Sequence, residues 1–433
     1  MRYGILTLIF VFILDASTLK IEDNNTIRYS FEQYISQLLS QDNSYINSYL
    51  ETKITHIKNI NKESRYNFNL DFVTSLSYDK EFLENGVLAY NSDLNNEFIF
   101  QKKLYDGQKS SIKTKKTFLE QRLSELNYLK KKEQMIVLGL HIYKNLLILQ
   151  EQLRIEKRVK KDKKQLLKDI TKREKILKKS EIDRLIIENE ILNIDKNIIS
   201  LVQLYKSYIH IFKQTINFNE NKKIQLGWIH ISKNIANLLN IKKMTLLKNS
   251  DILISENILK LSENKIVMES KQKDWEIDFE SRIGYRYSQT KTSDNRYESD
   301  GMVWQNNITF KYPIFQRDDR SLNIEVAKLE TLQKKNLLNQ KQKDILNALE
   351  ERYTQYEQFY KLKTILKQQS KIVQKISKNM KQRYLIGLSS YSEYSREFDK
   401  KTNNEKSKLL NNINIISSLI DISLLSGNQI FGK

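Results

Sequence analysis

Two segments of the chain alternate apolar and polar residues one by one. In the first, Phe68, Leu70 and Phe72 are separated by polar residues, and in the second, apolar side chains recur at odd positions across residues 275–287. Successive side chains of a strand point to opposite faces of a sheet, so this period of two predicts β-strands.

A polar loop and a further apolar stretch follow each alternating segment. We therefore expect two β-hairpins, over residues 67–105 and 275–315, with loops near 79–96 and 288–301. An apolar face opposite a charged face is typical of strands that lie between lipid and water. A hairpin on the surface of a soluble domain would show the same alternation, so both settings remain open at this point.

Each expected hairpin is followed by a long segment with a helical pattern. From Gly107 to about Lys172 there is no proline and one interior glycine, Gly139, and from Arg317 to about Arg383 there is neither. Apolar residues recur three and four positions apart, which predicts helices that pack as coiled coils. At about 1.5 Å per residue, each helix would span on the order of 100 Å.

Shorter helical patterns accompany the two long ones. A returning helix completes a helical hairpin in each half, over residues 107–216 and 317–425. Further helices over about 29–62 and 244–273 would stack on the returning helices and complete the length of the bundle. The stretch 217–243 is less regular, and we expect an equatorial side segment there.

The two halves of the chain repeat the same order of elements. A shift of 210 residues places 98–106 on 308–316, and the following helices and turns align without a gap. We expect structural repeats over 18–216 and 244–433, each built from a helix, a β-hairpin and a long helical hairpin, with a C-terminal tail after the second.

Composition excludes several classes of protein. The 433 residues include only 10 Gly and one Pro, too few for the many turns of a compact α/β enzyme. We predict no enzyme, because no nucleophile, base and orienting residue can be placed together and no phosphate-binding glycine motif is present. Cysteine is absent and the four His are scattered, so we expect neither a metal nor a cofactor.

The net charge of +21 comes from Lys and Arg residues spread along the whole chain. A nucleic-acid-binding protein usually concentrates them in one patch, so we do not expect a nucleic-acid partner, although a coiled coil that binds nucleic acid remains an alternative. The N-terminal residues 1–17 combine a positive start with an apolar run and resemble a secretory signal peptide. A buried helix or strand is the alternative there, and no later segment is apolar enough for a transmembrane helix.

Four strands cannot close on themselves in a lipid bilayer. Unpaired strand edges have no hydrogen-bond partners there, and known membrane barrels begin at about eight strands. We therefore expect several copies of the chain to share one barrel. Aromatic residues near the strand ends suit the two membrane interfaces: Tyr78, Trp275, Tyr287, Trp304 and Tyr312.

The transitions from strand to helix resemble those of the TolC family of outer-membrane efflux proteins. That family carries a motif of the type Pro-Leu-Phe-Asp-Gly-Gly at this place. Asp106 and Gly107 match its second part in the first repeat, and Pro313, the only proline, matches its first part in the second repeat. Proline cannot donate a ladder hydrogen bond, so it also suits the end of a strand.

The turns between the paired helices resemble the same family. In the second turn, a Tyr-x-x-Gly pattern is followed by small residues and an acid: Arg383, Tyr384, Gly387, Leu388, Ser389, Ser390 and Glu393. The first turn matches more loosely, at Leu177, Ser180 and Asp183. The resemblance implies that these turns dock a periplasmic adaptor. It also implies that Tyr384 hydrogen-bonds Asp183 between neighbouring hairpins and holds an entrance closed.

The resemblance implies a homotrimer that combines a shared twelve-stranded transmembrane β-barrel with an α-helical barrel. It would lie in the lipid of the outer membrane, extend into the periplasm, and export small molecules or proteins passively. An inner-membrane transporter and a periplasmic adaptor would act with it, and untwisting of the helix tips would open it. The alternative is a secreted structural or adhesive coiled-coil protein of the cell envelope.

The same family lines its entrance with two acidic residues three positions apart. Glu393 matches the first, and Arg396 replaces the second. We expect Arg396 to neutralise Glu393 and to weaken the preference of the entrance for cations.

Overall fold

The computed structural model describes residues 21–23, 26–64, 68–82, 88–177, 181–218, 222–230, 236–271, 274–292, 295–312 and 320–427. The predicted signal peptide, Ser180 and Pro313 lie outside these ranges. The chain divides into two compact units. We name them the β unit (Asn47–Lys130 and Leu247–Asp344) and the α unit (Met1–Ile46, Lys131–Leu246 and Ile345–Lys433).

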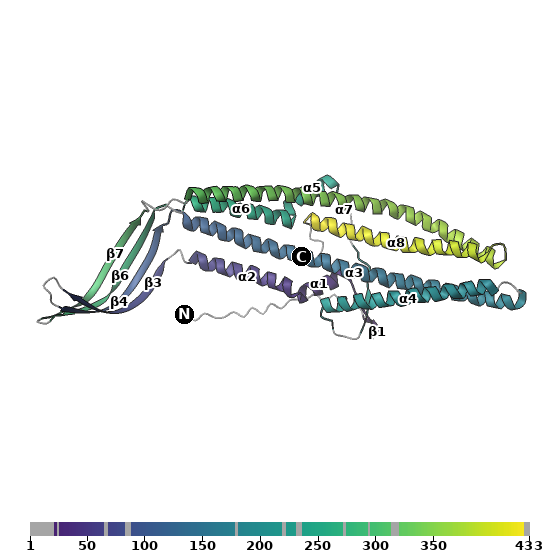
Figure 1. Cartoon of the computed structure of the whole chain (residues 1–433), viewed down its shortest axis with the longest axis horizontal. Coiled ribbons are helices and arrows are strands. Elements are labelled where there is room, and N and C mark those ends of the chain that lie inside the picture. The colour runs from purple at the N-terminus through teal and green to yellow at the C-terminus, as the bar shows by residue number, and fades with distance from the viewer. Residues whose placement is uncertain are drawn as a thin grey trace. The chain divides into compact units, whose positions relative to one another are not determined.

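A four-stranded antiparallel sheet forms the strand part of the β unit (Figure 1). Its strands lie in the order β3, β4, β6, β7, with bounds Asn69–Phe82, Leu88–Tyr105, Glu276–Lys291 and Arg296–Lys311. The prediction of long polar loops at 79–96 and 288–301 was wrong, because pairing continues to Phe82 opposite Leu88 and to Lys291 opposite Arg296. Polar side chains do not prevent backbone ladder bonds, so the polar ends of both hairpins are still strand.

The two faces of the sheet differ in chemistry. On one face, large apolar side chains are exposed, with Phe72 at 60%, Trp304 at 75% and Ile308 at 72%. On the other face, charged side chains pair across strands. Lys103 Nζ lies 2.8 Å from Glu276 Oε2, and Arg286 Nη2 lies 3.2 Å from Oε1 of the buried Glu97. The alternation in the sequence therefore separates a face suited to lipid from a face suited to water.

Helices of the β unit follow the same order as its strands. The bounds are Asn43–Ser64 for α2, Lys109–Leu177 for α3, Ser250–Ser270 for α6 and Arg320–Leu385 for α7. The amide of Asn59 on α2 donates to the Thr117 carbonyl of α3 at 3.0 Å. On the other side of α3, Asn257 of α6 donates to the Leu119 carbonyl at 2.7 Å. Lys265 of α6 then pairs with Glu330 of α7 at 2.7 Å, so α2 and α7 are the outer helices.

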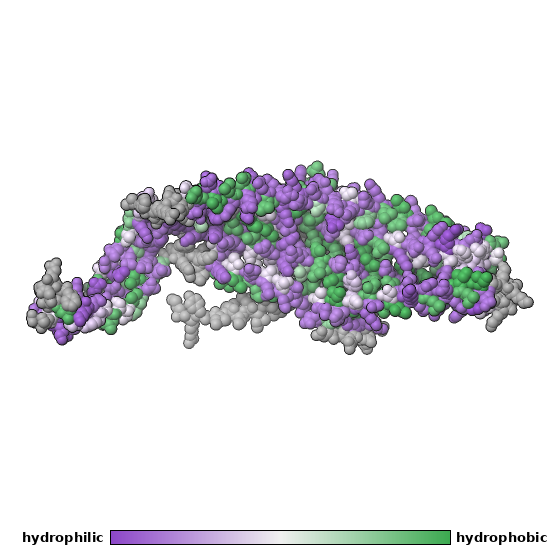
Figure 2. All heavy atoms as spheres, viewed as in Figure 1, coloured by the Kyte–Doolittle hydropathy of each residue, from purple (hydrophilic) through white to green (hydrophobic). Residues whose placement is uncertain are grey.

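These two outer helices carry exposed apolar side chains. On α2 they recur at helical spacing and are 48–65% exposed: Leu50, Ile54, Ile57 and Ile60. On α7 they are 51–61% exposed: Leu322, Val326, Leu329 and Leu332. Figure 2 shows hydrophobic residues, in green, interspersed with hydrophilic ones along the helices. Apolar residues at this spacing are typical of a helix face that packs against another helix.

The α unit contains the main hydrophobic core. Its helices are α1 (Phe31–Gln41), α4 (Glu181–Thr215), α5 (Leu238–Lys248) and α8 (Tyr391–Leu425), together with the second parts of α3 and α7. The ring of Tyr34 on α1 stacks on Phe212 of α4, with centroids 4.3 Å apart. A side chain at Gly139 of α3 would lie 2.4 Å from Ile35, so this glycine lets α1 approach α3 closely.

A small sheet lies beside this core, in the order β1 (Ile21–Asp23), β2 (Thr26–Tyr29) and β5 (Lys223–Leu226). The buried Tyr143 of α3 holds it, because the Tyr143 hydroxyl lies 2.9 Å from the Tyr29 carbonyl and 2.7 Å from the Gly227 carbonyl. The amide of Gln150 pairs with both backbone groups of Leu226 and so covers part of the β5 edge. None of the helices in the described ranges is long and apolar enough to cross a membrane.

Gly284 provides a test of the sheet register. A Cβ atom at Gly284 would lie 2.1 Å from the Asn96 carbonyl oxygen and 2.6 Å from Glu97 Cα, both in the backbone of β4, whereas nothing lies within 4 Å at Gly301. We expect Gly284→Ala to lower the free energy of unfolding by about 1–3 kcal/mol, as overpacking usually does. Gly301→Ala is the control and should change it little. Guanidinium unfolding in detergent measures both, and equal effects would contradict the close approach of β4 and β6.

Candidate functional site

The turn between α7 and α8 has a geometry that its sequence explains. Gly387 has a φ of 82°, a conformation that glycine adopts without strain. The Leu388 N–H donates to the Arg383 carbonyl at 2.9 Å, and the Gly387 N–H donates to the Tyr384 carbonyl at 3.1 Å. These two bonds form a Schellman motif, which ends α7 and reverses the chain.

The start of α8 is fixed by a capping box. Ser390 Oγ accepts from the Glu393 N–H at 3.2 Å, and Glu393 Oε2 accepts from the Ser390 N–H at 3.0 Å. The Glu393 carboxylate therefore serves the helix start. Arg396 Nε lies 3.6 Å from Glu397 Oε1, and the expected neutralisation of Glu393 by Arg396 stays a prediction.

Tyr384 and Asp183 come together, as the resemblance implied. The Tyr384 hydroxyl donates to Asp183 Oδ2 at 3.1 Å and joins the end of α7 to the first turn of α4 within one chain. A carboxylate in the first turn of a helix is also favoured by the helix dipole. This hydrogen bond links the two helical hairpins, α3–α4 and α7–α8, at their tips.

The residues predicted to dock an adaptor surround the same tips. Leu388 is 66% exposed, Ser390 is exposed, and the buried Oγ of the half-buried Ser389 has no partner among the described atoms. Leu177 is the last residue of α3, and its side chain lies outside the described part, as does Ser180. Two further apolar side chains at the tips, which the sequence reasoning did not single out, are exposed: Ile182 at 68% and Ile386 at 70%.

At the strand-to-helix transition, the position of Gly107 accommodates only glycine. Its φ is 64°, and a Cβ atom there would lie 2.4 Å from Asp274 Cβ. Asp106 precedes it and accepts a hydrogen bond from the Ser110 N–H, which caps the start of α3. Both residues therefore shape the junction between β4 and α3.

Near the tips of the helical hairpins lies a buried ionic cluster that the sequence analysis did not predict. It consists of Lys163, Glu190, Tyr391 and Ser395, which we call the Lys163 cluster. The Lys163 side chain is only 3% exposed, and its ammonium lies 2.7 Å from Glu190 Oε2, 3.0 Å from the Tyr391 hydroxyl and 3.1 Å from Ser395 Oγ. Lys163 belongs to α3, Glu190 to α4, and the other two to α8, so the cluster joins three helices.

Ionisation in the Lys163 cluster is set by burial and by pairing. Burial opposes the charge of Glu190, but hydrogen bonds from Lys163, Tyr391 and Ser395 outweigh it and hold the Glu190 pKa below its ordinary value. Burial, followed by the hydrogen bond to Glu190, raises the pKa of Tyr391. At neutral pH Glu190 is therefore a carboxylate and Tyr391 a neutral phenol.

Aromatic contacts connect the Lys163 cluster to the Tyr384–Asp183 bond. The rings of Tyr384 and Tyr391 meet edge to face with centroids 5.6 Å apart, and the ring of Tyr394 stacks parallel to that of Tyr384 at 6.0 Å. Burial, and then the nearby Asp162, Glu190 and Asp399, raises the pKa of Tyr394 to about 12. The two polar contacts thus belong to one continuous packed region.

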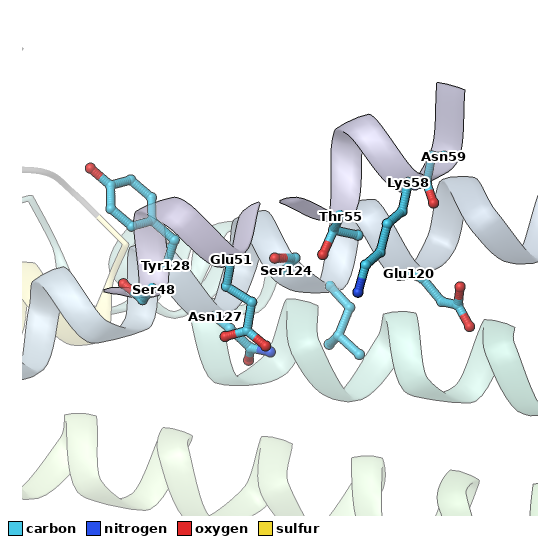
Figure 3. A pocket seen from close by; sticks show the side chains of 10 residues that line it. Ser48, Glu51, Thr55, Lys58, Asn59, Glu120, Ser124, Asn127 and Tyr128 are labelled. Atoms are coloured by element: carbon cyan, nitrogen blue, oxygen red, sulfur yellow. The ribbon is translucent and has the colours of Figure 1, made fainter. Parts of the chain in front are cut away.

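A separate polar groove lies between α2 and α3 in the β unit, with a volume of about 330 Å³. Figure 3 shows Lys58 reaching toward α3 between Thr55 and Glu120, while Glu51 lies beside Asn127. The lining mixes both charges, and the described residues contain no group of three or more side chains suited to hold a metal ion. The groove therefore offers no convergent set of ligands.

Comparison with known proteins supports the resemblance. Residues 276–414, from the start of β6 into α8, match the model of the family described as outer membrane efflux protein. The resemblance to TolC-family channels is thereby confirmed for this part of the chain. Among the curated proteins, none matches the sequence.

Solved structures of outer-membrane channels share the fold over nearly the whole chain. The open state of MtrE from Neisseria gonorrhoeae is 15% identical, with 93% of this chain and 89% of that chain covered and a TM-score of 0.71. CmeC from Campylobacter jejuni is 13% identical, with 92% and 85% covered and a TM-score of 0.72. VceC from Vibrio cholerae is 12% identical, with 92% and 96% covered and a TM-score of 0.72. The predicted fold class, mainly helical with a β part, is confirmed.

The charge state of the Lys163 cluster gives a pH-dependent prediction. We expect Glu190→Gln to destabilise the folded chain at neutral pH by about 3 kcal/mol, because it leaves the buried Lys163 ammonium without a carboxylate. The folded pKa of Glu190 is lowered, so its stabilisation is present above the unfolded pKa of about 4.3 and is lost as pH falls through the lower folded pKa.

Thermal unfolding followed by circular dichroism at pH 7 and pH 3 measures this difference. The variant should unfold at a lower temperature than the native chain at pH 7, and the gap should narrow at pH 3. Glu188→Gln is the control, because the Glu188 side chain is 41% exposed and pairs with Arg184 on its own helix. A gap that is the same at both pH values would show that Glu190 acts through its shape alone.

Proposed function

We propose that this chain is one subunit of a trimeric outer-membrane export channel. Three copies would close their sheets into a twelve-stranded barrel, and their helices would form a tunnel in the periplasm. Substrates, small molecules or proteins, would pass through without an enzymatic step. A signal peptide at 1–17, the repeat boundaries and the equatorial segment at 217–243 stay predictions of the same proposal.

The observation that carries the proposal is the sheet with two open edges and one apolar face. Both outer strands, β3 and β7, have one edge without a partner strand in the described chain. Backbone groups on such an edge need partners in lipid, where an unpaired group costs several kcal/mol. Pairing β3 of one copy with β7 of the next would satisfy both edges and would leave the apolar face toward the lipid.

The helices of the β unit support the same assembly. The exposed apolar residues of α2 and α7 lie on the two outer helices, which stand next to the two outer strands in the order of elements along the chain. A second copy that pairs its β7 with β3 would also bring its α7 toward α2. Burying both apolar stripes would then favour the assembly, at roughly 25 cal/mol for each Å² of apolar surface.

The tips of the helical hairpins are the proposed periplasmic entrance. The hydrogen bond from Tyr384 to Asp183 would hold it closed, and untwisting of the tips would open it. A periplasmic adaptor would dock on the exposed apolar side chains Ile182, Ile386 and Leu388, since exposed apolar patches mark interaction surfaces. An inner-membrane transporter would deliver the substrate. The effect of Arg396 on ion selectivity stays a prediction.

Disulfide cross-linking tests the shared barrel, and the native chain contains no cysteine that would interfere. Cysteine pairs with one partner in β3, such as Ser75→Cys, and one in β7, such as Gln305→Cys, Asn307→Cys or Val303→Cys, are expected to link different copies. Denaturing gels without reductant should show covalent dimers and trimers and nothing larger.

Ser92→Cys with Gln289→Cys is the matched control, because these two positions pair within one chain across β4 and β6. This pair should form a disulfide without raising the apparent mass above that of one chain. If every β3–β7 pair gave only monomers while the control pair was oxidised, the shared barrel would be refuted. The secreted coiled-coil alternative predicts that result, together with solubility in the absence of detergent.

Conductance in planar lipid bilayers tests the entrance. We expect the native chain to form small, mostly closed pores, and Tyr384→Phe to raise the conductance because it removes the hydrogen bond to Asp183. Asp183→Asn should also raise the conductance. Tyr360→Phe is the control, because Tyr360 is a 55% exposed tyrosine on the same helix. Equal conductance in the native chain and all three variants would contradict the proposed entrance.

A further inference from the structure

The Lys163 cluster contains the most deeply buried ion pair among those resolved in the described chain. Only 3% of the Lys163 side chain is exposed. Its ammonium has three protons and three oxygen partners, those of Glu190, Tyr391 and Ser395, at 2.7–3.1 Å. The ammonium also lies over the ring of Phe398, 4.9 Å from its centroid. A lysine is rarely placed so deeply unless its partners are fixed as well.

The hydrogen-bonding groups of the Glu190 carboxylate are also paired within the Lys163 cluster. Glu190 Oε1 accepts from Ser395 Oγ at 2.8 Å, and Glu190 Oε2 accepts from both Lys163 and the Tyr391 hydroxyl. Lys163 therefore binds the other three groups, and Glu190, whose side chain is 28% exposed, binds Tyr391 and Ser395 as well. A closed network of this kind holds only while α3, α4 and α8 keep their relative positions.

Neighbouring ion pairs on α3 differ from this cluster. One turn earlier, Lys160 pairs with Asp195 of α4 only, and its side chain is 27% exposed. Arg158 pairs with Glu405 of α8 only and is 51% exposed. Either pair could exchange its partner for water at little cost. Lys406 of α8 also joins the second hairpin to the first, through Glu156 of α3, and the Lys406 side chain is 32% exposed. The Lys163 cluster joins the two hairpins through a lysine side chain that is only 3% exposed.

We propose that the Lys163 cluster is a positioning element of the entrance, which holds α8 against the α3–α4 hairpin and makes the closed state a discrete one. This inference rests on the proposed function. Moving α8 away from α3 and α4 would take Tyr391 and Ser395 away from both the Lys163 ammonium and the Glu190 carboxylate. Partial displacements are disfavoured, because they break these four hydrogen bonds before water can replace them. Because Tyr391 contacts Tyr384, breaking the Tyr384–Asp183 bond and breaking the cluster become coupled steps.

The inference predicts a specific effect on gating. In planar bilayers, Lys163→Met is expected to increase the fraction of time spent in the conducting state by about tenfold, within the usual range of couplings between sites. Lys160→Met is the matched control: it removes a lysine from the same helix whose partner lies within the same hairpin, and the open fraction should not change. Thermal unfolding of both variants shows whether they fold alike.

Single hydrogen bonds provide variants that keep the fold. Tyr391→Phe and Ser395→Ala each remove one partner of the cluster and retain the ion pair, so each should raise the open fraction by a smaller factor than Lys163→Met. Ser392→Ala, at an exposed position of the same turn, should have no effect. These variants decide the question even if Lys163→Met fails to assemble.

A double-mutant cycle between Lys163→Met and Tyr384→Phe tests the coupling. If the two contacts form one unit, the double variant should open little more than the more open single variant. Independent, multiplicative effects would overturn the coupling. If Tyr384→Phe opens the channel but Lys163→Met, Tyr391→Phe and Ser395→Ala do not, this inference fails and the proposed function stands. If no variant and no native sample conducts, the proposed function itself fails.

Discussion

In the part of the chain that the structure describes, the outer edges of β3 and β7 have no partner strand, and this is the constraint on which the rest of the structure depends. A four-stranded sheet with an apolar face is stable neither in water, which the apolar face avoids, nor alone in lipid, which the edges avoid. The proposed edge pairing between copies would resolve both problems together. It also gives a reason for the apolar residues on α2 and α7, which would otherwise be exposed at the flanks of each copy.

Much of the fold could be predicted because the spacing of apolar residues along a strand or a helix shows which of its faces is buried or meets lipid. Alternation identified the first strand of each hairpin, the apolar stretch after it indicated the second strand, and spacings of three and four identified the long helices. The ends of the strands could not be predicted, because the polar residues between Asp79 and Asn96 describe contact with water and not the backbone conformation. The role of Gly139 was also hidden, since it depends on the approach of α1 from a distant part of the chain.

The candidate site was predicted only in part, and the reason differs from one group of residues to the next. Gly387, Ser390 and Glu393 are explained by local turn and cap geometry, which a sequence encodes directly. The contact between Tyr384 and Asp183 followed from a family resemblance. Lys163 could not have been found, because it is one of many lysines in the chain, and its partners lie 27, 228 and 232 residues away.

The buried asparagines of α6 have a consequence for how the chain folds. Asn257 and Asn264 lie seven residues apart and donate to the carbonyls of Leu119 and Ile112, which also lie seven apart. Sliding α6 along α3 by two turns would bring Asn264 to the Leu119 carbonyl, so these bonds alone discriminate weakly between alignments. The short connection from Ser270 to Glu276 removes the ambiguity by tying α6 to a strand whose pairing is already determined. The register of the sheet therefore fixes which of the two alignments α6 adopts along α3.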